Sequence, residues 1–178
     1  MQWKALGILD QGRLLVLTGK ASDAVQVINS GIAAFRSTGS TTWMPWQLLF
    51  LASAHAQLGQ FDDARHCIGE AMTMLETSGE RWCEAEVNRI AGEIALMSGE
   101  PEAARAEAYF ERALAVSRKQ QARSWELRAA MSMARLWRDQ GKRKQALELL
   151  APIYGWFTEG FETRDLKDAK TLLDALSS

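Results

Sequence analysis

Apolar residues recur along the chain at intervals of three and four positions, and no segment alternates apolar and polar residues with a period of two. Such spacing gathers apolar side chains on one face of an α-helix. The sequence therefore predicts an all-α fold without β-sheet. The predicted helices span residues 3–18, 21–37, 43–58, 61–77, 80–98, 102–118, 124–140, 143–158 and 163–176.

Four glycines divide the first eight predicted helices into pairs. Gly19, Gly59, Gly99 and Gly141 each follow an apolar helical run, and they are 40, 40 and 42 residues apart. A period of this length is typical of solenoids, in which each helix pair buries its apolar face against neighbouring pairs. We therefore predict one superhelical domain over residues 1–178. Its repeats are expected at about 3–40, 41–79, 80–120 and 124–160, with a capping helix at 163–176.

Residues at equivalent positions of the four pairs also agree. A small residue, a large one four positions later and a small or apolar one three positions after that follow each glycine, and a small residue stands seven positions before it. In the third pair these residues are Ala106, Phe110, Ala113 and Gly92. The pattern resembles the tetratricopeptide repeat, which implies close helix crossings at these positions. Because the period exceeds the roughly 34 residues of that family, we expect longer helices or turns.

Several residues predict where helices begin. Thr77 with Glu80 has the pattern of a capping box, and Ser124 and Thr163 are expected N-caps. Pro45 and Pro101 are typical of a first helical turn.

The two ends of the array differ in polarity. The last helix carries charged residues on one face and leucines such as Leu166 and Leu173 on the other, as a helix that closes a stack does. The first helix has no capping residue and carries Leu9, Leu14 and Leu17 on more than one side. We therefore expect another part of a longer protein, or a second subunit, to cover this end.

Charge and composition exclude several classes of function. A net charge of −1 provides no long-range positive field for a nucleic-acid backbone. Charged residues interrupt every apolar run before it reaches the roughly 20 residues of a membrane span, and the first residues lack the basic-then-apolar order of a signal peptide. We therefore expect a cytoplasmic protein that binds neither nucleic acid nor membrane.

The cysteines and histidines do not have the spacing of metal ligands. Cys67 and Cys83 are the two cysteines and belong to no Cys-x-x-Cys pair, and His55 and His66 are the two histidines. Metal sites need three or four convergent ligands, and a cytosolic protein keeps isolated thiols reduced. We expect two reduced core thiols, no metal, no cofactor and no catalytic residue.

The first helix of each pair lines the concave face of a tetratricopeptide stack, so its inward residues can be projected from the turn glycines. The projection selects Trp46, Leu49, Glu86, Arg89, Glu93, Arg128, Met131, Arg135 and Arg138. The two apolar residues at Trp46 and Leu49 would contact an apolar anchor, and the arginines would bind an acidic peptide, a carboxylate or a phosphate. In the alternative interpretation, the glutamates pair with arginines of the adjacent helix and the face satisfies its own charges.

Three segments carry a second resemblance: residues 79–93, 124–142 and 150–161. They resemble the C-terminal tails of bacterial multidomain signalling proteins, in which a class III adenylate/guanylate cyclase domain or a DNA-binding domain precedes an ATPase and such repeats. The resemblance implies an origin in signalling. It implies no activity for this chain, which contains neither the paired metal-binding aspartates of a cyclase nor a phosphate loop of the GxxxxGK[ST] kind.

These observations together predict a non-catalytic scaffold that binds a peptide or a neighbouring domain on its concave face. Two other functions stay open: a sensor that holds an anionic metabolite in the same groove, and a homodimerisation module that uses the N-terminal end. The aromatic residues near the C-terminus, among them Trp137, Trp156 and Phe161, are expected to form a core that holds the last helix in place.

Overall fold

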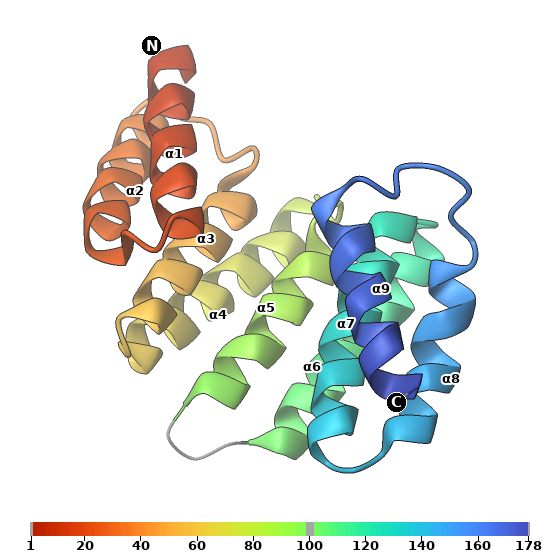
Figure 1. Cartoon of the computed structure of the whole chain (residues 1–178). Helices are drawn as coiled ribbons and strands as arrows, with labels where there is room; N and C mark the ends of the chain where they lie inside the picture. Colours follow the sequence, from red (N-terminus) through yellow and green to blue (C-terminus); the bar gives the residue numbers. More distant parts are fainter. Residues whose placement is uncertain (1, 99–101, 178) are drawn as a thin grey trace.

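The computed structural model describes residues 2–98 and 102–177, and this part of the chain consists of helices and connections without strands (Figure 1). The helices are α1 (Gln2–Leu17), α2 (Ala21–Arg36), α3 (Met44–Gln57), α4 (Phe61–Ser78), α5 (Glu84–Met97), α6 (Ala103–Lys119), α7 (Arg123–Asp139), α8 (Arg143–Tyr154) and α9 (Arg164–Ser177). The predicted all-α fold is confirmed. The predicted bounds agree to within one residue except at the start of α5 and the end of α8, which differ by four.

The helices form four successive pairs, α1/α2, α3/α4, α5/α6 and α7/α8, and α9 packs on α7 and α8 at the end of the array. The first helices of the pairs contact one another in order, α1 with α3, α3 with α5 and α5 with α7. Within the described residues, the second helices make no such contacts along their own row. Because the first row is the tighter one, the array curves around it and α1, α3, α5 and α7 face the concave side (Figure 1).

Glycines turn the chain between the helices of three pairs. Gly19, Gly59 and Gly141 have φ angles of 75°, 73° and 78°. This left-handed conformation is one that glycine adopts without the steric penalty of a side chain. Gly99, the predicted counterpart in the third pair, lies outside the described residues. The observed turns confirm the glycine period in the other three pairs.

Small residues allow the two helices of a pair to approach each other closely. A Cβ atom at Gly92 of α5 would lie 2.4 Å from Cε1 of Phe110 on α6, and one at Gly12 of α1 would lie 2.4 Å from Cγ1 of Ile28 on α2. Phe110 and Ile28 are 0% and 1% exposed. The large residue of one helix therefore fills the space that the missing side chain of the other leaves, as the repeat pattern predicts.

Buried apolar side chains form two clusters that meet on α5. The first cluster extends from α1 to Ile94, and it includes Phe35 and Leu48. The second begins at Ala95 and extends to the leucines of α9, with Phe110 among its members. Each half of the array therefore has a core of its own.

Two predicted helix starts are wrong. Thr77 lies inside α4, where its hydroxyl donates to a carbonyl oxygen one turn earlier at 2.9 Å, and Glu80 lies in the connection to α5. A capping box does not form because Gly79 ends α4 in a left-handed conformation with φ of 73°. Ser124 is the second residue of α7 rather than its N-cap, since the helix begins one residue before it.

Other predicted helix starts agree with the structure. Pro45 stands in the first turn of α3, where its missing N–H leaves no hydrogen bond unmade. Thr163 directly precedes α9, at the predicted N-cap position, but the hydrogen bond of its hydroxyl is to the carbonyl oxygen of Gly160 at 2.7 Å rather than to a backbone N–H of the first helical turn. Pro101 lies outside the described residues.

The two ends of the array differ as expected. Helix α9 buries one face, formed by Leu166, Ala169, Leu172, Leu173 and Leu176, and so closes the C-terminal end. At the N-terminal end, α1 buries Leu9 but leaves Leu14 63% and Leu17 66% exposed. Interior helices bury the residues equivalent to Leu14, namely Ala54 and Ile94, at 0% and 3% exposure. Leu14 thus occupies a position that a preceding pair would bury.

Candidate functional site

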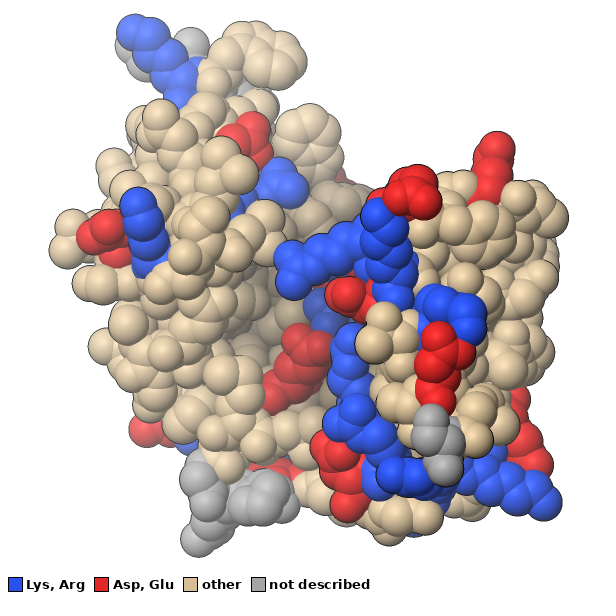
Figure 2. Space-filling view, in the orientation of Figure 1, with Lys and Arg blue, Asp and Glu red and all other residues tan. Residues whose placement is uncertain are grey.

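A groove of about 440 Å³ follows the concave face, and side chains from α1, α3, α5, α7 and α9 line it. In Figure 2 the side of the molecule formed by α1, α2 and α3 is mostly uncharged, whereas the side formed by α7 and α9 is rich in charged side chains. The groove lies where these two surfaces meet, so its two walls differ in chemistry.

One wall of the groove is apolar. It is formed by Val16 and Leu17 of α1, Trp46 and Phe50 of α3, and Ile90 and Met97 of α5. Leu17 and Met97 are 66% and 49% exposed, which is unusual for apolar side chains of this size at a concave surface. This wall, called the apolar wall below, therefore offers contact area to a ligand.

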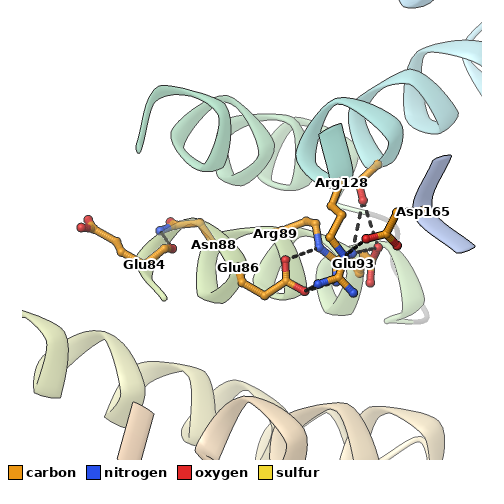
Figure 3. Close-up of polar contacts among 8 residues, drawn as sticks. Glu84, Glu86, Asn88, Arg89, Glu93, Arg128 and Asp165 are labelled. Atoms are coloured by element: carbon orange, nitrogen blue, oxygen red, sulfur yellow. Dashed lines mark hydrogen bonds and ion pairs between the residues drawn. The ribbon is translucent and has the colours of Figure 1, made fainter. Parts of the chain in front are cut away.

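The charged wall is centred on a buried ion pair within α5 (Figure 3). Nε and Nη2 of Arg89 each donate to a carboxylate oxygen of Glu86 at 2.8 Å. The side chains of Glu86 and Arg89 are 4% and 11% exposed. Nη1 of Arg89 also donates to Glu93, one turn further along the helix. Two parallel hydrogen bonds of this kind fix the position of both groups.

Residues from α7 and α9 extend this network (Figure 3). Nη1 of Arg128 lies 3.0 Å from Oε1 of Glu86, and Nε of Arg128 lies 3.4 Å from Oδ2 of Asp165. The hydroxyl of Ser132 donates to Oε1 of Glu93 at 3.0 Å. The network therefore joins α5, α7 and α9 across the groove wall.

Two opposing effects act on the pKa of Arg89. Burial alone would lower it, because burial disfavours the charged guanidinium. The hydrogen bonds and negative charges of Glu86 and Glu93 outweigh burial and raise the pKa above its ordinary value. Arg89 therefore stays charged, and its charge is balanced by Glu86 and Glu93 of the same helix.

The other arginines of the groove are paired as well. Arg13 lies 3.0 Å from Asp10, and Arg164 lies 3.7 Å from Asp168. Both pairs are substantially exposed, so each is weak. The arrangement agrees with the interpretation in which the concave face satisfies its own charges, and it leaves the apolar wall as the unpartnered part of the groove.

The structure brings together six of the nine predicted site residues. Trp46, Leu49, Glu86, Arg89, Glu93 and Arg128 line the groove. Met131 does not, because it is 4% exposed and packs in the second core cluster with the leucines of α9. Arg135 and Arg138 do not line the groove either, and Arg138 pairs with Asp139 at 2.9 Å. Helix α9 packs on α7 and occupies part of the face that the projection assigned to a ligand.

The projection also missed residues that line the groove. Phe50 and Ile90 stand four positions after Trp46 and Glu86, whereas the projection had stepped by three to Leu49 and Arg89. The sequence did offer a signal for these two residues, because residues three and four positions apart lie on the same face of a helix. Arg164 had no sequence signal, since it comes from the capping helix.

Both cysteines are buried and free. Burial raises the pKa of the Cys67 thiol to about 11 and that of Cys83 to about 12, with nearby carboxylates adding to the shift. A thiol with so high a pKa forms little thiolate near neutral pH and reacts slowly. The expectation of free core thiols is therefore confirmed.

We expect Cys67 and Cys83 to resist alkylation by iodoacetamide at neutral pH in the folded protein and to react readily in urea. The folded state favours the neutral thiol, so the raised pKa values contribute stability below the ordinary thiol pKa of 9.0. This contribution to the free energy of unfolding is lost as the pH rises above 9.0 toward the raised pKa values of about 11 for Cys67 and about 12 for Cys83. Mass spectrometry of alkylated protein measures the reaction, and rapid labelling of either thiol in the native protein would contradict the expectation.

Within the described ranges, no group of three or more His, Cys, Asp or Glu side chains could hold a metal ion. The same ranges contain no helix that is both long enough and apolar enough to span a membrane.

Comparisons with known proteins agree with this architecture. Two segments match the tetratricopeptide repeat family, residues 45–67 in α3 and α4 and residues 127–152 in α7 and α8. The nearly identical TPR-like repeats of a putative kinesin light chain from Podosopora anserina form a similar solved structure, with a TM-score of 0.71 and 16% identity over 99% of this chain and 86% of that chain. A variant of the same repeats gives a TM-score of 0.71 and 16% identity over 97% of this chain and 84% of that chain. No curated protein matches the chain.

Two segments of the chain thus match the tetratricopeptide repeat, and the described residues fold as a TPR-like superhelix. Such repeats generally mediate protein–protein interaction through their extended concave surface. The groove lies on this surface.

Proposed function

We propose that this chain is a non-catalytic protein-interaction domain that binds an amphipathic segment of a partner protein in the groove. The apolar wall supports the proposal most directly, because Leu17 and Met97 are exposed at the groove. A segment with one apolar and one polar face fits a groove whose walls differ in this way. The apolar face would lie on the apolar wall and the polar face along the charged wall.

The pairing of the arginines favours a peptide over an anionic metabolite. A free carboxylate or phosphate would have to displace Glu86 from Arg89 and Arg128, or Asp165 from Arg128. Displacement of Glu86, whose side chain is 4% exposed, leaves a buried carboxylate unpaired, which is unfavourable. The charged wall is therefore suited to orienting a ligand that the apolar wall holds.

We further propose that the domain acts in a bacterial cytoplasmic signalling protein and contacts its partner within one polypeptide or between two. The support is the sequence resemblance, which is most specific over residues 124–176. A cyclase or ATPase domain in the same reading frame is the expected finding, and an unrelated enzyme there would contradict it. Self-association through Leu14 of α1 is the alternative use of the N-terminal end, and sedimentation of the chain measures it.

The groove is tested with peptides selected for binding to this chain from a displayed library of random sequences. We expect the selected peptides to be amphipathic and to lose at least tenfold in affinity when Leu17 and Met97 are both replaced by lysine. Each lysine places a charge where the apolar contact would form, and tenfold corresponds to about 1.4 kcal/mol. Fluorescence anisotropy of labelled peptides measures the affinity.

Leu14→Lys is the matched control, since Leu14 is about as exposed as Leu17 on the same helix but does not line the groove. Affinity should be unchanged in this variant. If the Leu17/Met97 variant binds the peptides as tightly as the unmodified chain, or if both variants lose affinity equally, the groove is not the binding site. Circular dichroism of each variant confirms that it is folded.

A further inference from the structure

A second concave feature adjoins the groove at the N-terminal ends of α1, α3 and α5. It is a hollow of about 480 Å³ lined by four indole rings, those of Trp3, Trp43, Trp46 and Trp82. Its volume falls within the range of about 300–1,000 Å³ that is typical of ligand sites. We call this feature the tryptophan hollow. Arg13 and Trp46 lie on the boundary that it shares with the groove.

Three of the four tryptophans of the hollow come from the same or an adjacent place in successive repeats. Trp3 and Trp43 each stand 16 residues before the turn glycine of their pair, and Trp82 stands next to that position in the third pair. The rings of Trp46 and Trp82 have centroids 5.4 Å apart, and Trp125 continues the row with its centroid 6.1 Å from that of Trp82. The repeat thus generates a row of indoles across three of the pairs.

Core packing does not account for this hollow. Trp3, Trp43 and Trp82 are 83%, 46% and 39% exposed. The expected aromatic core around the last helix is a separate feature, and it is wrong for Trp156 and Phe161, which are 56% and 43% exposed. Trp43 also keeps a left-handed backbone with φ of 64°, which is strained for a residue with a large side chain. Exposed indoles gathered in one concavity are typical of a binding surface.

The hollow offers more hydrogen-bond donors than acceptors. Within the described part of the chain, none of its four indole N–H groups donates a hydrogen bond, whereas the indole of Trp137, outside the hollow, donates to Glu107 at 2.6 Å. A ligand rich in acceptors and poor in donors would complement this surface.

One buried acceptor adds detail to this picture. Gln47 lines the hollow, is 4% exposed, and its Oε1 has no hydrogen-bond partner. A buried polar atom without a partner is unfavourable unless something bonds to it. A ligand N–H group would reach this atom only after the Gln47 side chain turns toward the hollow, because Oε1 is inaccessible to solvent in the structure.

The protein's own cation disfavours a cationic ligand at one end of this aromatic surface. The guanidinium of Arg13 lies 5.6 Å from the ring centroid of Trp46 and 4.8 Å from that of Phe50. It also pairs with Asp10, the acidic residue of the hollow, at 3.0 Å. An ammonium group at Trp46 would therefore meet the positive charge of Arg13.

We propose that the tryptophan hollow binds a proline-rich segment in the polyproline II conformation. Proline has no N–H, and this helix has no internal hydrogen bonds, so its carbonyl groups are free to accept from indole N–H donors. The pyrrolidine rings pack on the indole faces, as in other aromatic-lined grooves for such segments. The proposal is independent of what the groove binds.

The test uses acetylated decaproline as the probe and follows the tryptophan Nε1–H signals in ¹H–¹⁵N correlation spectra. We expect saturable shifts of the signals of Trp3, Trp43 and Trp82, and none at Trp137 or Trp156. A glycine–serine peptide of the same length should shift none of them. Trp82→Ala should weaken decaproline binding at least tenfold.

Trp156→Ala is the matched control, because Trp156 is 56% exposed and packs against Phe157 away from the hollow. This variant should bind decaproline normally. The Leu17/Met97 lysine variant should also bind normally, which separates this result from the outcome for the groove. Trp3→Ala provides a second variant, since a side chain that is 83% exposed contributes little to the fold.

Three results would overturn the proposal. Decaproline could leave the hollow signals unshifted, or the glycine–serine peptide could shift them equally. Alternatively, the signals could move with protein concentration alone, which would identify a second copy of the chain as the occupant. Sedimentation at the same concentrations distinguishes this last case.

Discussion

Replacing Phe110 by alanine should lower the free energy of unfolding by about 3–5 kcal/mol, because the ring is fully buried and its removal leaves a cavity. The ring fills the space beside Gly92, where a Cβ atom would lie 2.4 Å from it. The surrounding helices are held by neighbouring pairs and cannot close the space. Urea denaturation followed by circular dichroism measures the loss.

The second helix pair of the array suggests a control variant. It carries Ala52 and Ile68 at the positions of Gly92 and Phe110. Gly92→Ala alone should destabilise by about 1–3 kcal/mol through overpacking against the ring. Adding Phe110→Ile to Gly92→Ala recreates the pair of the second repeat, so the double variant should be more stable than the sum of the single changes predicts. Strict additivity of the two changes would show that the residues do not share one packing site.

Replacing Glu86 by alanine should destabilise the protein by about 3–5 kcal/mol, because it leaves the buried charge of Arg89 without its bidentate partner. Arg128 also loses its contact with Glu86 and keeps only Asp165. Thermal and urea denaturation measure the change. The effect is large because Arg89 is buried and cannot turn to solvent.

A surface pair provides the contrast. Glu148→Ala removes the partner of Lys144, an exposed pair at 3.8 Å, and should change stability by less than about 1 kcal/mol. Replacing Glu86 and Arg89 together by leucine and methionine should recover much of the stability lost in the single variant, since Glu93, the carboxylate on α5 that then loses Arg89, is 37% exposed and reaches solvent. Equal losses for Glu86→Ala and Glu148→Ala would show that the buried pair contributes no more than a surface pair.

Local signals in the sequence predicted the architecture well. The turn at Gly19 needs a left-handed residue, and the crossing of Gly92 with Phe110 needs a small residue opposite a large one. Each requirement involves only residues of one helix pair, and these residues are close in the sequence. The repeat then multiplies each signal, so that the whole array could be predicted from one pattern.

Contacts between distant elements could not be predicted in the same way. Met131 and Arg135 were assigned to the groove because nothing in α7 indicates that α9 packs on it. The capping box at Thr77 was predicted from a spacing that also occurs inside helices, and Gly79 overrode it. The tryptophan hollow depends on how neighbouring repeats place Trp46 and Trp82 side by side, which the sequence spacing alone does not reveal.

The division of the core at α5 has a consequence for how the molecule responds to a partner. Ile94 belongs to one cluster and Ala95 to the next, although Tyr109 of α6 and Trp125 of α7 also pack against the first cluster. We therefore expect the free energy of local unfolding to differ between the two halves. The groove crosses this division, with α1 on one side and α9 on the other. A bound segment would touch both halves at once, so occupation of the groove would couple their local stabilities.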